Sequence, residues 1–361
     1  MTEPTCYRCG RQPCDCRDGV TLFQGDCIGV MDGMPRDSVD LVFGSPPYAD
    51  ARTYGIGADR DCEAWVEWML AVSEAAARIS RGPVLWVVAG VTRQRCYWPG
   101  VEGLMWEWWK RGGAHHLYRP AAFHRVGIPG SGGDDWLRCD WEYVVCLKRP
   151  GKLAWADNTA AGHPPRWAPG GEMSHRLSDG QRVNQWGKCG NDTASGVKVT
   201  ESGFMRSQGK RPSHRNVQTR RRKDGPRPGS RGHDGMQNQE QDYTEPALAN
   251  PGNLLTGVEY LEEAQKALDA YERGDVRSGK VGGGLMGDPL AHENEAPFPE
   301  WLAEVFVTSF CPEQGIVCDP FLGSATTAAV ARKWGRRCIG IDLRESQLRI
   351  AGKRLAQGVL F

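Results

Sequence analysis

The sequence has no run of eighteen consecutive apolar residues and no basic leader followed by an apolar stretch. A membrane-spanning helix needs about 20 apolar residues, and a secretory signal needs both parts of such a leader. We therefore expect a cytoplasmic protein with no membrane span and no signal peptide. The chain has 361 residues, 40% of them hydrophobic and 25% charged, which is enough for a full core and for more than one domain.

A disulfide framework is also missing from most of the chain. The thirteen cysteines are odd in number and scattered through apparent strands, which is typical of a reducing compartment. The exception is the segment 1–19, which contains CYRCGRQPCDC with Cys6, Cys9, Cys14 and Cys16. Four thiols so close together favour a tetrahedral zinc site, which would stabilise a segment too short to have a core. Disulfides or a merely reactive tail are the alternatives.

Acidic residues are nearly absent from one stretch. Between Arg206 and Arg231 there are ten Lys or Arg and one acid, Asp224. This stretch carries +9 and leaves −8 for the rest of a chain whose total is +1. Such a basic segment indicates an anionic partner, nucleic acid first, with a solvated loop as the alternative. Within it, Arg220, Arg221, Arg222 and Lys223 form the densest run.

The order of predicted elements divides the chain into four parts. Residues 20–150 alternate strands with a helix over 62–80, and residues 291–361 again alternate helix and strand. Between them, residues 151–290 are rich in Gly, Arg, Asn, Ser and Pro, so we expect a partly disordered region whose one clear helix covers 256–275. Alternation of strand and helix predicts an α/β sheet with helices on both faces.

The last strand–helix–strand unit has the pattern of a nucleoside site. The strand over 316–318 leads into DPFLGSATT, which opens a helix, and the next strand ends in Asp342, 23 residues after Asp319. A carboxylate at that position accepts hydrogen bonds from ribose hydroxyls, and a helix N-terminus receives anionic groups. Gly323 is the only glycine of the loop, so this is not the dinucleotide fingerprint.

A strand near the N-terminus ends in the tetrapeptide SPPY, residues Ser45 to Tyr48. Proline has no N–H and a fixed φ, so the two prolines terminate the strand on a stiff, donor-poor turn. Together with DPFLGSATT, this motif resembles motifs IV and I of the amino-group DNA methyltransferases, which use S-adenosylmethionine (AdoMet). The segment HENEAPFPEWL, from residue 292, resembles motif X of that family. Catalytic motif first and cofactor motif last is the order called the β class.

The resemblance implies a fold, a cofactor and roles for individual residues. It implies a Rossmann-like AdoMet-dependent methyltransferase sheet, with residues 151–290 as an inserted target-recognition region. The catalytic residues would be Ser45, Pro46, Pro47 and Tyr48. The cofactor-binding residues would be Asp26, Pro297, Phe298, Asp319, Phe321, Gly323, Ser324, Thr326, Thr327 and Asp342. Asp342 would hold the ribose and Asp26 would approach the adenine amino group.

One residue departs from the family pattern. The family usually has GSGTT, whereas this chain has Ala325 at the second glycine. If that position needs a positive φ, alanine costs about 1 kcal/mol, and weaker cofactor binding would follow. A DNA-binding protein with a decayed AdoMet site is therefore an alternative to the enzyme.

The resemblance implies that the target is a base of double-stranded DNA. It favours N4 of cytosine, because the family more often has Asp or Asn at the position of Ser45 in enzymes that act on N6 of adenine. N6-adenine methylation is the alternative, and methylation of RNA or protein is a rival outside DNA. The resemblance also allows a cognate restriction endonuclease as a partner in a prokaryotic or phage-infected cell. Monomer and homodimer both stay open.

Overall fold

A computed structural model describes residues 5–12, 14, 16, 18–49, 60–124, 139, 141–162, 252–255 and 298–356. All of them lie in one of two units into which the chain divides, made of residues 1–163 and 250–361. The other unit, residues 164–249, lies outside the described residues, as does the helix predicted over 256–275.

A nine-stranded sheet runs through the described unit. Its strands are β1 (Val20–Gln24), β2 (Leu41–Gly44), β3 (Val84–Val88), β6 (His116–Leu117), β7 (Ala121–His124), β8 (Trp141–Lys148), β9 (Leu254–Leu255), β10 (Ile316–Asp319) and β11 (Arg337–Asp342). The strand order is β1-β11-β10-β2-β3-β8-β7-β9, and β6 pairs with β8. The strands from β1 to β3 in this order are mutually parallel, whereas β8 is antiparallel to β3.

The two ends of the chain are therefore interleaved in one sheet. β10 and β11 come last in the sequence, yet they lie between β1 and β2. Neighbouring strands of the sheet thus come from the segments 20–150 and 291–361, which lie more than a hundred residues apart in the sequence.

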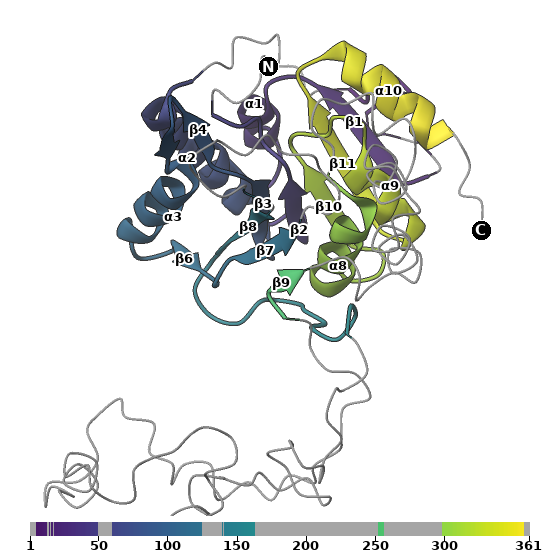
Figure 1. Cartoon of the computed structure of the whole chain (residues 1–361). Helices are drawn as coiled ribbons and strands as arrows, with labels where there is room; N and C mark the ends of the chain where they lie inside the picture. The colour runs from purple at the N-terminus through teal and green to yellow at the C-terminus, as the bar shows by residue number, and fades with distance from the viewer. Residues whose placement is uncertain are drawn as a thin grey trace, which may run out of the picture. The chain divides into compact units, whose positions relative to one another are not determined.

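Helices cover both faces of the sheet, as Figure 1 shows. They are α1 (Cys27–Asp32), α2 (Cys62–Ile79), α3 (Gly100–Lys110), α8 (Glu300–Phe310), α9 (Thr326–Lys333) and α10 (Glu345–Ala356). α1, α2 and α3 form one layer, and α8, α9 and α10 form the other. Side chains of a strand alternate between faces, so Val84 and Trp86 of β3 pack toward α2 while Leu85 and Val87 pack toward α8. The predicted α/β sheet with helices on both faces is confirmed.

The sequence pattern of α2 explains why it forms and what it covers. Asp61 caps the helix, because its Oδ1 accepts a hydrogen bond from the Ala64 N–H at 2.8 Å. Apolar residues at helical spacing, Trp65, Met69 and Val72 among them, are all buried against the sheet. The helix ends at Ile79, where Ser80 turns to an extended conformation, one residue before the predicted end.

Two of the three tryptophans of α3 are exposed. Trp108 of α3 is 1% exposed, but Trp106 and Trp109 are 57% and 56% exposed and pack against each other. α3 buries one face only, so neighbouring tryptophans point in different directions.

A small hairpin, β4 (Val91–Arg93) with β5 (Cys96–Trp98), precedes this helix. Among the described residues, no helix is both long and apolar enough to cross a membrane.

Candidate active site

Four adjacent parallel strands end at one edge of the sheet, and the predicted site residues follow their carboxyl ends. The register pairs Gln24 of β1 with Asp342 of β11, and Cys318 of β10 with Val42 of β2. The chain leaves β10 toward α9 and β2 toward α2, which lie on opposite faces. Ligands of open α/β sheets bind outside the carboxyl ends, at the point where the connections diverge in this way. The edge from β1 to β2 is therefore the candidate site.

Asp319 at the end of β10 lies directly beside the end of β2. A Cβ on Gly44 would meet the Asp319 Oδ1 atom at 2.5 Å, so only glycine lets the two strand ends approach this closely. Asp319 Oδ1 accepts a hydrogen bond from the Phe321 N–H at 3.0 Å. Burial raises the pKa of the Asp319 carboxyl to about 7. The contact between Gly44 and Asp319 brings the turn 45–48 next to the loop 319–327.

Asp342 fixes the other side of that loop. Its Oδ2 accepts a hydrogen bond from the Gly323 N–H at 3.0 Å, and its Oδ1 accepts one from the Arg344 N–H at 2.8 Å. Gly323 has a φ of 51°, which favours glycine. The Asp342 backbone carbonyl accepts a hydrogen bond from the Gly25 N–H at 3.1 Å, which joins the end of β1 to the end of β11.

Ala325 has the left-handed conformation that the sequence analysis identified as the costly case. Its φ is 67° and its ψ is 36°, and it is the residue that caps α9. It is fully buried, and its neighbours Ser324, Thr326 and Thr327 are buried as well. The N-terminus of α9 therefore begins inside the protein, next to Asp319 and Asp342.

The loop has polar groups that suit a cofactor with charged and polar parts. The Thr327 hydroxyl favours the charged form of Asp319, yet it makes no hydrogen bond of normal geometry with any described residue. A fully buried hydroxyl without a partner is costly unless a ligand supplies one. The N–H groups at the start of α9 and the Asp342 carboxylate add donors and an acceptor. These residues fit the AdoMet role that the sequence resemblance implies.

Arg354 of α10 holds the loop from behind, and the sequence analysis did not identify it. The side chain is 3% exposed, and its Nη1 donates hydrogen bonds to the Ser324 carbonyl at 3.0 Å and to Thr326 Oγ1 at 3.1 Å. Its Nη2 forms an ion pair with Glu300 at the start of α8. One guanidinium thus ties the loop to two helices. In the sequence it looks like any basic residue near a helix C-terminus, so no signal marks it.

The SPPY turn is held by partners on α2 and β8. Trp65 Nε1 donates a hydrogen bond to the Pro47 carbonyl at 2.8 Å. The Tyr48 hydroxyl donates one to Glu142 Oε2 at 2.8 Å, and both residues are buried. Within the described part of the chain, no hydrogen bond engages Ser45 Oγ or the Pro46 carbonyl, and both are hydrogen-bond acceptors. Glu142 was not predicted, because one acid in a strand has no distinguishing pattern.

Phe321 and Phe298, two of the predicted cofactor-binding residues, pack on opposite faces of the sheet. Phe321 packs edge-on against Trp68 of α2 and Trp86 of β3, with ring centroids 5.7 and 5.8 Å apart. Phe298 lies on the opposite face, where it packs edge-on against Phe43 of β2 at 5.4 Å. Both rings thus contact residues of the segment 20–150.

Asp26 has a structural role in addition to its predicted one. It caps α1, because its Oδ2 accepts a hydrogen bond from the Gly29 N–H at 2.9 Å, and its side chain is exposed beside the end of β1. Its contact with an adenine amino group stays a prediction. Five predicted site residues lie outside the described residues, namely Pro297, Arg220, Arg221, Arg222 and Lys223.

Comparison with known protein families gives a match in the second half of the chain. Residues 210–353 match a family model described as DNA methylase. The match covers less than half of the chain. The matched segment includes α8, β10, α9 and β11, so it contains the loop 319–327 and Asp342.

Two relatives match the chain over short stretches. Type II methyltransferase M.ScaI from Streptomyces caespitosus is 47% identical over 60 residues, which are 17% of this chain and 20% of that protein. Type II methyltransferase M2.DpnII from Streptococcus pneumoniae is 47% identical over 57 residues, which are 16% of this chain and 21% of that protein. These matches cover about a fifth of the length of the curated relatives.

One solved structure has a similar fold along most of the chain. The structure of the PvuII DNA methyltransferase (cytosine-N4-specific) is similar with a TM-score of 0.53 and 14% identity, over 95% of this chain and 88% of that one. The predicted resemblance to the amino-group methyltransferases and the Rossmann-like methyltransferase fold are confirmed.

Proposed function

We propose that the protein transfers the methyl group of AdoMet to an exocyclic amino group of a base in double-stranded DNA. The observation that carries this proposal is the contact between two motifs far apart in the sequence. The turn Ser45–Tyr48 and the loop Asp319–Thr327 lie side by side because β2 pairs with β10 and Gly44 leaves room for Asp319. A methyl donor bound at the loop and an amino group bound at the turn would therefore meet at one sheet edge.

The chemistry requires acceptors on the amino group. Its lone pair is delocalised into the base ring, and acceptors aimed at both N–H bonds favour a pyramidal nitrogen that can attack in line. Ser45 Oγ and the Pro46 carbonyl are such acceptors, and the hydrogen bond from Trp65 to Pro47 fixes the turn that presents them. Tyr48 is held by Glu142 at the same place, where an extruded base would contact its ring.

AdoMet, when bound, supplies an electrophilic methyl on a sulfonium. The residues that would hold it are those of the loop, with Asp342 for the ribose and the start of α9 for the amino-acid part. Phe321 and Phe298 would limit the space on either side of the place where the turn 45–48 meets the loop 319–327. Arg354 keeps the loop in place without contacting the cofactor itself.

N4 of cytosine is the target base that we propose. The support is Ser45, since this residue is more often Asp or Asn in enzymes that act on N6 of adenine. A hydroxyl accepts a hydrogen bond from either amino group, so N6 of adenine is the second candidate. The PvuII enzyme is named cytosine-N4-specific, but at 14% identity this likeness concerns the fold alone.

The DNA partner is supported by the charge distribution. The stretch from Arg206 to Arg231, with +9, would follow phosphates, and the target-recognition region would span residues 151–290. The curated relatives are named type II methyltransferases, so a cognate restriction endonuclease and a cytoplasmic location belong to the same proposal.

The test is incubation of the full chain with labelled AdoMet and mixed-sequence duplex DNA, followed by digestion to nucleosides and mass spectrometry. We expect N4-methylcytosine; N6-methyladenine would move the target to the second candidate. Ser45→Ala should reduce the rate by about a hundredfold, as the loss of one preorganised partner does in other active sites. Ser38→Ala is the matched control, since the buried Ser38 hydroxyl has no partner among described residues. No methylated base on any duplex would refute the proposal.

Calorimetry with AdoMet separates the enzyme from a DNA-binding protein with a decayed site. The enzyme binds AdoMet in the presence of duplex DNA. If the wild-type chain binds DNA but binds no AdoMet, the protein is a DNA-binding protein whose AdoMet site has decayed.

A further inference from the structure

Four cysteine side chains near the N-terminus converge on one point. The Sγ atoms of Cys6, Cys9, Cys14 and Cys16 all lie within 4.8 Å of one another. The Cys9 and Cys14 sulfurs are 3.7 Å apart, and none of the four cysteines is in a disulfide. Cys6 is 1% exposed and the other three are half-buried.

This arrangement has the dimensions of a tetrahedral thiolate site. Zn–S bonds of about 2.3 Å in a tetrahedron place the sulfurs about 3.8 Å apart, close to the separation of Cys9 and Cys14. A disulfide needs sulfurs about 2.05 Å apart, so no pair is joined or nearly joined. The Cys16 N–H points at the Cys14 sulfur at 3.5 Å, the kind of outer hydrogen bond that supports a metal-bound thiolate.

We propose that Cys6, Cys9, Cys14 and Cys16 bind one Zn²⁺ ion in a closed, structural site. Four protein ligands leave no open coordination position, so the ion has a structural and no catalytic role. The segment is too short to form a core, and metal binding supplies the free energy that orders it.

The residues between the first two ligands attach this site to the sheet. The Tyr7 N–H donates a hydrogen bond to the Leu22 carbonyl of β1 at 2.7 Å, and the Tyr7 hydroxyl donates one to Glu345 at the start of α10 at 3.3 Å. Arg8 Nη1 donates to the Val20 carbonyl at 3.2 Å. The zinc-binding segment therefore lies along β1, which is the last strand at its side of the sheet.

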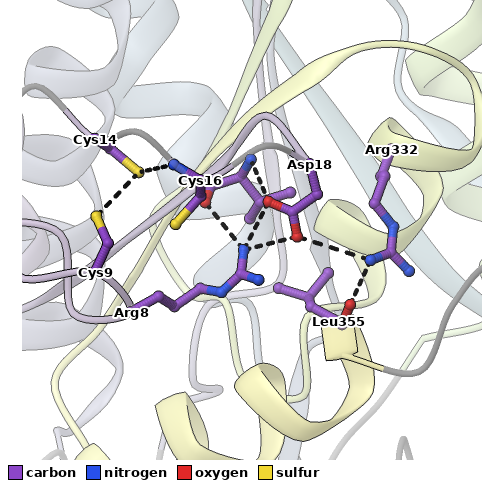
Figure 2. Close-up of polar contacts among 8 residues, drawn as sticks. Arg8, Cys9, Cys14, Cys16, Asp18, Arg332 and Leu355 are labelled. Atoms are coloured by element: carbon purple, nitrogen blue, oxygen red, sulfur yellow. Dashed lines mark hydrogen bonds and ion pairs between the residues drawn. The ribbon is translucent and has the colours of Figure 1, made fainter.

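A chain of charged groups continues from this segment to α9 and α10 (Figure 2). Arg8 Nη1 contacts Asp18 at 2.8 Å, and Asp18 lies 3.8 Å from Arg332 of α9. Arg332 in turn donates a hydrogen bond to the Leu355 carbonyl of α10. The metal site thus covers the open edge of β1, and loss of the metal should loosen that edge.

The experiment measures metal content of the full chain, which does not depend on methyl transfer. The protein is purified with Zn²⁺ present, dialysed, and analysed by elemental mass spectrometry, with circular dichroism to verify folding. We expect one Zn²⁺ per chain. Replacement by Co²⁺ should give the intense visible bands of tetrahedral thiolate coordination. Cys9→Ser and Cys14→Ser should lose the metal, whereas Cys96→Ser, at an exposed cysteine outside the cluster, should keep it.

Three results would overturn the proposal. One is a folded wild-type chain that retains less than about a tenth of an equivalent of Zn²⁺. Another is mass spectrometry under non-reducing conditions that shows two disulfides among the four cysteines. The third is a Co²⁺ complex without thiolate bands. Because wild-type protein gives each of these results, unfolding of a cysteine variant does not obscure the answer.

Discussion

At the scale of single residues, Ala325 occupies a backbone conformation that costs alanine free energy. Its φ of 67° is in the left-handed region, where a Cβ crowds the following carbonyl. Ala325→Gly removes that strain but also a buried methyl group. We expect the free energy of unfolding to rise by up to about 1 kcal/mol and AdoMet to bind more tightly. Urea unfolding and calorimetry measure the two effects.

Ala328→Gly is the matched control, since Ala328 is equally buried but lies inside α9. Glycine there should lower the free energy of unfolding by about 1 kcal/mol. If Ala325→Gly destabilises the protein as much as Ala328→Gly does, the left-handed alanine is not strained.

Asp319 makes stability depend on pH. Burial raises the pKa of its carboxyl to about 7 in the folded state, against 3.8 for the free group. The folded state therefore holds the proton more tightly, and the stability this confers is present below pH 4 and lost as pH rises through 7. Asp319→Asn removes that loss. The melting temperature of the variant minus that of the wild type should therefore increase from pH 5 to pH 8.

The size of this effect is on the order of a few kcal/mol, because the group is fully buried. Asp32→Asn, at a carboxylate that is 62% exposed, serves as the control and should follow the wild-type profile. Parallel profiles for the wild type and Asp319→Asn would show that Asp319 does not titrate in this range.

At the scale of elements, Arg354 joins α10 to α8 and to the loop before α9. Arg354→Met removes the ion pair with Glu300 and two hydrogen bonds to the loop. We expect a loss on the order of 2–4 kcal/mol in the free energy of unfolding and weaker AdoMet binding. Chemical unfolding and calorimetry are the measurements.

Arg349 is on the same helix and pairs with Glu345 at the surface. Arg349→Met should therefore leave both quantities nearly unchanged. Equal effects of the two substitutions would mean that Arg354 contributes no more than any surface charge on α10.

The elements with a strong periodic pattern were the ones that the sequence predicted. The strands before SPPY and before DPFLGSATT and the helix α2 are apolar runs or amphipathic repeats, and each was found within a few residues. α1, with six residues, and β9, with two, are too short to show a period. Asp342 was predicted because it follows a strand, whereas Glu142 and Arg354 act through partners distant in the sequence. Such pairings depend on the tertiary packing and leave no local pattern.

At the scale of the whole molecule, the basic stretch should control the salt dependence of DNA binding. Each phosphate contact contributes about −0.9 to the slope of log K against log salt. Replacing Arg220, Arg221, Arg222 and Lys223 by Ser should therefore reduce the slope by about 3 to 4, as fluorescence anisotropy over a salt series would show. The three arginines changed to Lys keep the charge and should keep the slope. An unchanged slope in the Ser variant would mean that this run does not contact phosphates.

The interleaved strand order has a consequence for protein synthesis. β1 and β2 leave the ribosome early, but the strands that lie between them, β10 and β11, are translated only after residue 315. For most of translation the nascent chain therefore exposes the β1 strand and one side of β2, edges that other chains can pair with. A chain that stops before residue 316 would contain the SPPY turn and β3, but it would lack β10, the strand that brings Asp319 beside the turn. Premature termination would thus yield an aggregation-prone fragment, and no partly active enzyme.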